Sequence, residues 1–196
     1  MRTRDEYKEQ LVRQKALEIL VQEGFNGFSM QKIAKAAEVS PATLYIYFKD
    51  KDDLIIKLGI EEGLKMKQAM LKEFDPNMNF EQGLRLQWKN RSEYWLNNRH
   101  SYELFELLRN SQYKDKIADS VLEGFKEKMR AFVKNAVKNG ELKAMPVEVY
   151  WSMAFAPLHN LIRFHIEGRS LGNMPFTFSE DLMWQTFALV IKALKP

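Results

Sequence analysis

The sequence predicts an all-α fold. Apolar residues recur every three to four positions through most of the chain, which is the spacing of one face of an α-helix. We find no sustained two-residue alternation of apolar and polar side chains, the pattern that is typical of a half-buried strand. Serine, aspartate, glycine and proline stand where helices would begin and end, so these residues divide the chain into separate helices.

The first 50 residues predict one helix followed by two short ones. The apolar face of the first helix consists of Leu11, Val12, Ala16, Ile19 and Leu20. We expect Gly24 to end this helix. Ser29 is a candidate N-cap for the second helix, and Ser40 followed by Pro41 for the third, which would run to Phe48.

A long helix is expected next, because Asp50 can cap it and acidic residues lie in its first turn, where the helix dipole favours negative charge. It should end near Glu73, shortly before Pro76. The remaining pattern predicts helices near 80–97, 101–111, 113–139, 146–167 and 178–195. Pro157 should kink the helix at 146–167. We place a domain boundary after residue 50, which divides an N-terminal domain, 1–50, from a C-terminal helical domain, 51–196.

Composition restricts the class of protein. Of the 196 residues, 45% are hydrophobic, which is enough for a sizeable core. The absence of cysteine excludes disulfides, thiolate metal ligands and a cysteine nucleophile. The sequence has no uncharged apolar run of ~18 residues and no apolar segment at its charged N-terminus. We therefore expect a cytoplasmic protein without a membrane partner.

Residues 29–48 predict a helix-turn-helix, the arrangement in which the second helix enters the major groove of DNA. The outer face of that helix would present Pro41, Ala42, Thr43, Tyr45 and Tyr47. Small side chains at its start permit close approach to base edges, and tyrosine hydroxyls can donate to phosphate oxygens. Lys51 would add a charged phosphate contact. The alternative is an ordinary helical hairpin in which both tyrosines are packing residues.

The stretch from Ile19 to Leu54 resembles the N-terminal domain of TetR-family transcriptional regulators. The resemblance rests on the joint spacing of Glu23-Gly24-Phe25, Phe28-Ser29, Ile33-Ala34, Val39-Ser40, Thr43-Leu44-Tyr45, Tyr47-Phe48, Lys51 and Leu54. It implies a DNA-binding regulator with an N-terminal helix-turn-helix domain and a C-terminal ligand-binding and dimerisation domain. By position, it implies DNA contacts at Ser29, Gln31, Ala42, Thr43, Tyr45, Tyr47 and Lys51.

Two positions in this stretch are informative on their own. Gln31 has a direct physical rationale, since a side-chain amide pairs bidentately with adenine, although a solvated polar residue is the alternative. Glu38 departs from the family, which commonly has glycine in the turn between the two short helices. A left-handed backbone at this position would strain a residue with a Cβ by ~1–2 kcal/mol.

The C-terminal region supplies aromatic side chains for a ligand pocket. All four tryptophans lie beyond residue 65, and the resemblance implies that a small-molecule effector binds in this region. Aromatic side chains form adaptable apolar pockets, although such residues are more often ordinary core. The candidates around the Pro157 kink are Trp88, Trp95, Phe105, Trp151, Phe155 and His159.

A single recognition helix makes few contacts, so we expect a two-fold homodimer on a near-palindromic site. The helices near 146–167 and 178–195 would form the interface as a four-helix bundle. Its residues would be Leu158, Leu161, His165, Met183, Phe187, Val190 and Leu194. The alternative is that these faces complete the core of the monomer.

No enzyme activity, metal or cofactor is expected. The three histidines have no acidic partner at metal-ligand spacing, and helix capping explains the acidic run at 50–53. The sequence has no phosphate-binding glycine loop or cofactor motif. The leading hypothesis is a repressor that a small apolar or amphipathic ligand releases from its operator. The alternative is a small all-α ligand-binding protein or enzyme whose N-terminal hairpin does not read DNA.

Overall fold

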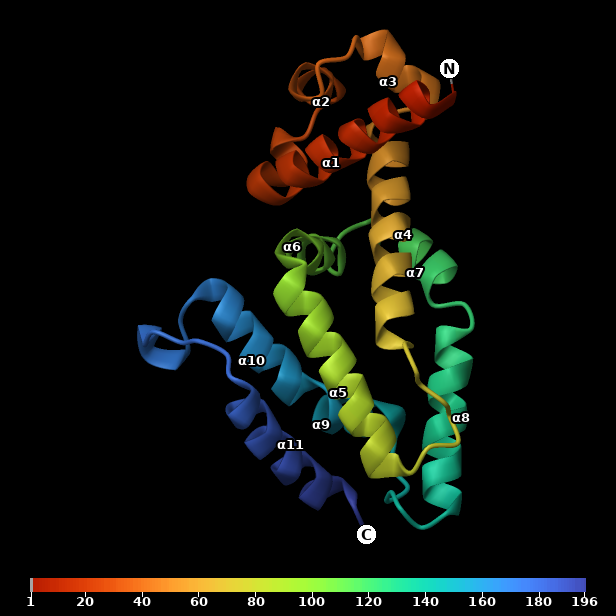
Figure 1. Ribbon diagram of the computed structural model, residues 1–196, viewed down its shortest axis with the longest axis vertical. Coiled ribbons are helices and arrows are strands. Elements are labelled where there is room, and N and C mark those ends of the chain that lie inside the picture. Colours follow the sequence, from red (N-terminus) through yellow and green to blue (C-terminus); the bar gives the residue numbers. More distant parts are fainter. Residues whose placement is uncertain (1) are drawn as a thin grey trace. The chain divides into compact units, whose positions relative to one another are not determined.

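The computed structural model describes the backbone of residues 2–196 and the side chains of residues 6–196. Over that range the regular structure is eleven α-helices and one short 3-10 helix (Figure 1). The described backbone pairs in β fashion only at an isolated bridge between Arg169 and Pro175. The prediction of an all-α fold is confirmed.

The chain forms two compact units. Unit 1 joins Met1–Lys65 with His100–Val121, and unit 2 joins Met66–Arg99 with Leu122–Pro196. These units are defined by which residues pack together. The predicted boundary after residue 50 instead separates the expected DNA-binding domain from the expected ligand-binding and dimerisation domain. That functional division stays a prediction.

Unit 1 contains the N-terminal helices and a helical pair from the middle of the chain. Its helices are α1 (Arg2–Gly27), α2 (Met30–Ala36), α3 (Pro41–Tyr47), most of α4 (Lys51–Met70), α6 (Arg99–Leu108) and α7 (Lys114–Val121). The core includes the face predicted for the first helix, because Val12, Ala16 and Leu20 are fully buried. Gly24 has a φ of +66°, so the regular helix is interrupted where the sequence predicts its end, and helical bonding resumes as far as Gly27.

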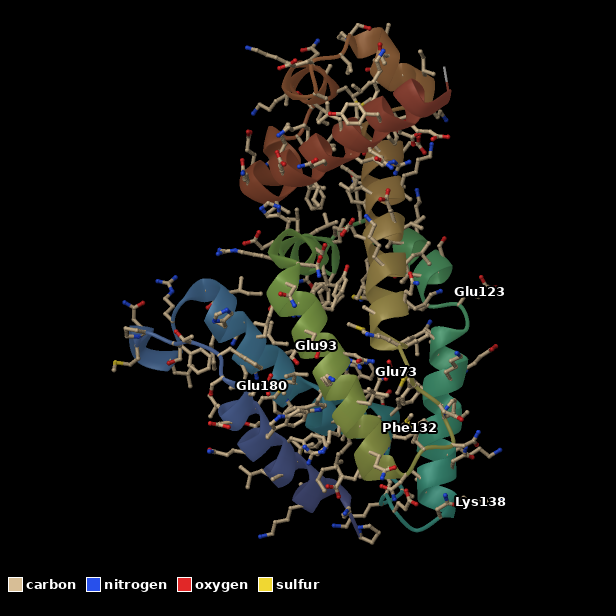
Figure 2. The ribbon with its side chains drawn as sticks, viewed as in Figure 1. Glu73, Glu93, Glu123, Phe132, Lys138 and Glu180 are labelled. Atoms are coloured by element: carbon tan, nitrogen blue, oxygen red, sulfur yellow. The ribbon has the colours of Figure 1, made fainter. Side chains whose placement is uncertain are left out.

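Unit 2 is built around the remaining helices. These are α5 (Phe80–Asn97), α8 (Phe125–Lys138), α9 (Val147–Ala154), α10 (Ala156–Glu167), the 3-10 helix η1 (Leu171–Asn173) and α11 (Glu180–Leu194). Helix α10 packs against α5, α9 and α11, and α8 packs against α5 (Figure 1). Phe132 points from α8 toward α5 (Figure 2), where its ring lies 5.8 Å from the ring of Phe80 between their centroids.

Two predicted helices are each divided in the structure. The prediction of a single helix at 113–139 is wrong, because the left-handed residue Gly124, with a φ of +69°, separates α7 from α8. The prediction of one kinked helix at 146–167 is also wrong. The backbone of Phe155 has a non-helical φ of −127°, and this residue separates α9 from α10. Pro157 lies in the first turn of α10, where its missing N–H costs no hydrogen bond.

Candidate nucleic-acid interface and effector region

Helices α2 and α3 begin at the serines that the sequence predicts as caps. The Oγ atom of Ser29 accepts a 3.3 Å hydrogen bond from the backbone N–H of Lys32. The Oγ atom of Ser40 accepts a 3.1 Å hydrogen bond from the backbone N–H of Thr43, and Pro41 is the first residue of α3. Both caps satisfy backbone donors that a helix start leaves without a partner.

The turn between α2 and α3 has the left-handed residue that a helix-turn-helix usually assigns to glycine. Glu38 has a φ of +53°. The backbone N–H of Val39 donates to the carbonyl oxygen of Ala34 at 3.0 Å and closes the turn. The chain therefore keeps the turn geometry and bears the strain of a Cβ in this region.

Buried side chains hold the helical pair against the rest of unit 1. Ile33 and Ala34 of α2, Leu44 of α3 and Phe48 are almost wholly buried in its core. Because these residues occupy the inner side, the remaining side of α3 faces solvent.

The seven predicted DNA-contact residues all lie in unit 1, and all are at least partly exposed. Ser29, Gln31, Ala42 and Tyr45 are exposed, while Thr43, Tyr47 and Lys51 are partly buried. These contacts stay a prediction.

Two of the seven side chains also stabilise the domain. The hydroxyl of Thr43 hydrogen-bonds to that of Ser40 at 2.8 Å, so the methyl group is its more available part. The ammonium of Lys51 donates at 2.6 Å to the carbonyl oxygen of Phe25, which ties the start of α4 to the end of α1. An ammonium has three donors, so this bond leaves capacity for a phosphate oxygen.

The sequence reasoning missed Ile46. Its apolar side chain, in the last turn of α3, is 77% exposed, more than the 56% of Tyr45. A branched apolar side chain in this position can contact the methyl group of thymine. The sequence contains a signal for this exposure, because Ala42, Tyr45 and Ile46 have the spacing of one helix face.

The charge of this segment favours an anionic partner. Between Ser29 and Lys51 the sequence has four lysines and two acidic residues, Glu38 and Asp50. Lys32 pairs with Glu23 of α1, and Lys35 is exposed at the end of α2. The excess of positive charge is small, and exposed lysines in this segment suit phosphate contacts.

Three of the predicted effector residues are brought together in unit 2. The indole nitrogen of Trp88 donates to the carbonyl oxygen of Ala154 at 2.7 Å, and Trp88 is wholly buried. The ring of Trp151 lies 4.6 Å from that of Phe155 between centroids, and Phe155 is wholly buried as well. These contacts join α5 to the break between α9 and α10.

The other predicted effector residues lie in different places. Trp95 is buried in α5, and His159 is partly buried in α10. Phe105 belongs to α6 and therefore to unit 1. The effector site stays a prediction.

Arg91 and Tyr150 are buried polar residues that the sequence reasoning missed. Burial lowers the pKa of the Arg91 guanidinium to about 9. Burial also raises the pKa of the Tyr150 phenol, and the charge of Arg91 partly opposes that rise. A helical spacing of three and four residues puts Arg91 on the same face of α5 as Trp88 and Trp95, and this signal could have drawn attention to it.

Most of the residues predicted for the dimer interface are buried within the single chain. Leu158, Met183, Phe187, Val190 and Leu194 are almost wholly buried in unit 2. Leu161 and His165 are partly buried, and Nδ1 of His165 accepts a hydrogen bond from the backbone N–H of Phe178 at 3.2 Å. The apolar character of these five buried residues is explained by the alternative, in which the two helix faces complete the core of the monomer. The interface itself stays a prediction.

Residues 12–58 match the family of bacterial regulatory proteins named after TetR. The solved structure of a TetR family transcription regulator from Marinobacter aquaeolei is similar to almost the whole chain, with a TM-score of 0.83. The likeness covers 99% of this chain and 98% of that chain, at 25% sequence identity. The N-terminal domain of this chain is therefore of the TetR type, and the whole chain has the fold of a TetR family regulator.

Similarity to curated proteins is confined to part of each chain. An uncharacterised HTH-type transcriptional regulator of Haemophilus influenzae is 36% identical over 72 residues, which are 37% of this chain and 38% of that protein. The fatty acid metabolism regulator protein of Bacillus subtilis is 40% identical over 47 residues, 24% of each chain. The chain therefore spans well under half the length of these relatives, whereas the TetR fold extends over the whole of it.

Among the described residues, we find no group of three or more acidic or histidine side chains that could hold a metal ion. None of the described helices has both the length and the apolar composition needed to span a membrane.

Proposed function

We propose that this chain is a DNA-binding transcriptional repressor of the cytoplasm that binds a near-palindromic operator. The observation that carries this proposal is the exposed side of α3. Its opposite face is anchored by the buried Leu44, while Ala42, Tyr45 and Ile46 project toward solvent. A short helix held in this way, with small residues at its start, suits entry into the major groove.

The operator would be read by two copies of the chain. Helix α3 has seven residues, so one copy contacts only a few base pairs. We propose a homodimer through the outward sides of α10 and α11. Leu189 of α11 supports this choice, because its large apolar side chain is 70% exposed on the outward side of the helix.

A small amphipathic ligand would release the operator. The aromatic residues Trp88, Trp151 and Phe155 supply the apolar surface for it, at a place where the backbone already changes direction. Binding must favour one conformation of the chain over another, and a coupling of ~1–3 kcal/mol would lower operator affinity ~5–150-fold.

Binding to duplex DNA at several salt concentrations tests the central claim. The probe is the DNA upstream of this protein's own coding sequence, and the control is a scrambled duplex of equal length and composition. We expect tighter binding to the upstream DNA and an affinity that falls steeply with salt, since bound lysines displace counterions from phosphates. Equal, weak binding to both duplexes would instead favour a helical ligand-binding protein or enzyme.

Sedimentation at micromolar concentration tests the homodimer. Leu189→Glu should give monomers, because it puts a charge on the proposed interface. Val147→Glu is the matched control, since Val147 is 65% exposed on α9, which is not one of the two helices of the proposed contact. A monomeric parent, or a Leu189→Glu variant that remains dimeric, would contradict the proposed interface.

A further inference from the structure

The guanidinium of Arg91 is buried in unit 2 without a carboxylate partner among the described residues. Only 1% of this residue is exposed. Its Nη1 atom donates to the backbone and side-chain oxygens of Gln87, one turn earlier in α5. Its Nη2 atom is buried and has no hydrogen-bond partner in the described part of the chain. A buried charge without a counter-ion is costly, so this arrangement calls for an explanation.

A second buried donor, the hydroxyl of Tyr150, lies in the same region of unit 2, near the ring of Phe155. The hydroxyl of Tyr150, from α9, also has no hydrogen-bond partner among the described residues. The central carbon of the Arg91 guanidinium lies 4.2 Å from the centroid of the Phe155 ring, and the ring of Tyr150 lies 6.1 Å from the same centroid. One cation and one phenol therefore both lie near the ring of Phe155, and each has a hydrogen to donate.

We propose that Arg91 and Tyr150 bind the carboxylate of an effector that has an apolar body and a single negative charge. This inference deepens the proposed function, because it names the chemical class of the ligand. The guanidinium would form a charge-assisted hydrogen bond through Nη2, and the phenol would donate to the other carboxylate oxygen. One positive charge compensates one negative charge, whereas a phosphate dianion would leave a charge unpaired in the core.

The surroundings of these two groups suit an apolar ligand body. Phe80 lies 6.5 Å from Tyr150 between ring centroids, and Trp88 is bonded to the residue that precedes Phe155. Ligand sites are commonly built in this way, with a mostly aromatic lining and a few polar groups that fix the orientation.

A purely structural role for Arg91 predicts a different outcome on substitution. If the cation stabilises the fold through the ring of Phe155, its replacement by a neutral side chain should destabilise the protein. If Arg91 instead serves a ligand, Arg91→Met should leave the melting temperature unchanged or raise it, because it removes an uncompensated buried charge and keeps much of the side-chain volume.

The experiment measures direct binding of two matched series of compounds to the full chain. The probes are straight-chain and phenylalkyl monocarboxylates, each paired with the primary alcohol of the same skeleton, followed by tryptophan fluorescence and calorimetry. We expect at least one carboxylate to bind about 10- to 100-fold tighter than its alcohol, as a charge-assisted hydrogen bond implies. Arg91→Met should abolish that preference, and Tyr150→Phe should reduce it several-fold.

Arg85→Met is the matched control, because Arg85 is an exposed arginine on the same helix whose guanidinium lies 4.7 Å from the ring of Trp184. It should keep the preference for carboxylates. The proposal is overturned if no carboxylate is preferred over its alcohol, or if Arg91→Met keeps the preference. Should Arg91→Met fail to fold, an undiminished preference in Tyr150→Phe overturns it. Operator binding without any ligand is measured separately, and its absence would count against the proposed function instead.

Discussion

The indole Nε1 atom of Trp88 donates a 2.7 Å hydrogen bond to the carbonyl oxygen of Ala154, the last residue of α9. A carbonyl at the end of a helix lacks the partner that the next turn would supply. The bond therefore satisfies an acceptor that the break at Phe155 releases. It also connects α5 to the junction of α9 and α10, although the two residues are 66 positions apart in the sequence.

Trp88→Phe should lower the free energy of unfolding by about 1–3 kcal/mol, because it leaves the buried oxygen of Ala154 without a donor. Urea denaturation followed by circular dichroism measures the loss. Trp151→Phe is the control, since Trp151 is exposed, and it should change stability by less than about 0.5 kcal/mol. Equal effects of the two substitutions would show that the hydrogen bond contributes nothing.

Glu38→Gly should stabilise the protein by about 0.5–1 kcal/mol. The left-handed conformation strains a residue with a Cβ by ~1–2 kcal/mol, and the extra freedom of glycine in the unfolded chain offsets part of that gain. Glu73, labelled in Figure 2, has a φ of +58° in unit 2 and should respond in the same way to glycine. Glu38→Ala keeps the Cβ, so thermal unfolding should show no stabilisation for it.

Gly83→Ala should destabilise the contact between α5 and α8. A methyl group on Gly83 would overlap the ring of Phe132, which is fully buried. Overpacking costs ~1–3 kcal/mol, more than the ~1 kcal/mol that alanine gains over glycine in a helix. In a Phe132→Leu background the same substitution should cost less, and a double-mutant cycle of chemical unfolding measures the difference. Strictly additive effects would contradict this account.

Tyr150 should make the protein less stable above pH 10. Burial raises the pKa of this phenol above its ordinary value of about 10, so the unfolded chain loses the proton at a lower pH than the folded chain. Unfolding then releases a proton, and the free energy of unfolding falls as pH rises through that range, by up to ~1.4 kcal/mol per pH unit.

Comparison of the parent with Tyr150→Phe isolates this contribution. Arg91, whose pKa burial lowers to about 9, has the opposite effect, because its folded form loses a proton before its unfolded form does. The difference in stability between parent and variant should therefore be constant up to about pH 10 and then move in favour of the variant. A difference that stays constant to pH 11 would show that the phenol is not perturbed.

Lys51→Ala should weaken binding to operator and scrambled DNA about equally and reduce the salt slope by ~1, because it removes one phosphate contact. Thr43→Ala should instead relax discrimination at one base position, at a cost of ~1–3 kcal/mol. Fluorescence anisotropy at several salt concentrations measures both. Lys138→Ala is the control, because Lys138 is an exposed lysine of α8, and it should leave the slope unchanged.

The sequence by itself determined the helical elements and the start of each helix in the helix-turn-helix. Ser29 and Ser40 cap their helices as predicted, because a cap depends on residues only three positions away. The exposed side of α3 also follows from spacing along one helix. The bond from Lys51 to the carbonyl of Phe25 did not follow, since it requires α1 and α4 to meet in space.

Only the tertiary structure decided where long helices break and which polar groups are buried. The apolar spacing continues through Phe155, and the break there is compensated by the indole of Trp88 from another helix. In the sequence, Arg91 has the pattern of an ordinary helical arginine. In the fold it is buried near Tyr150 of α9 and Phe155 at the break between α9 and α10. Burial is a sum over neighbours that are distant in sequence, so local patterns determine the elements and the packing between them determines which charges lose contact with water.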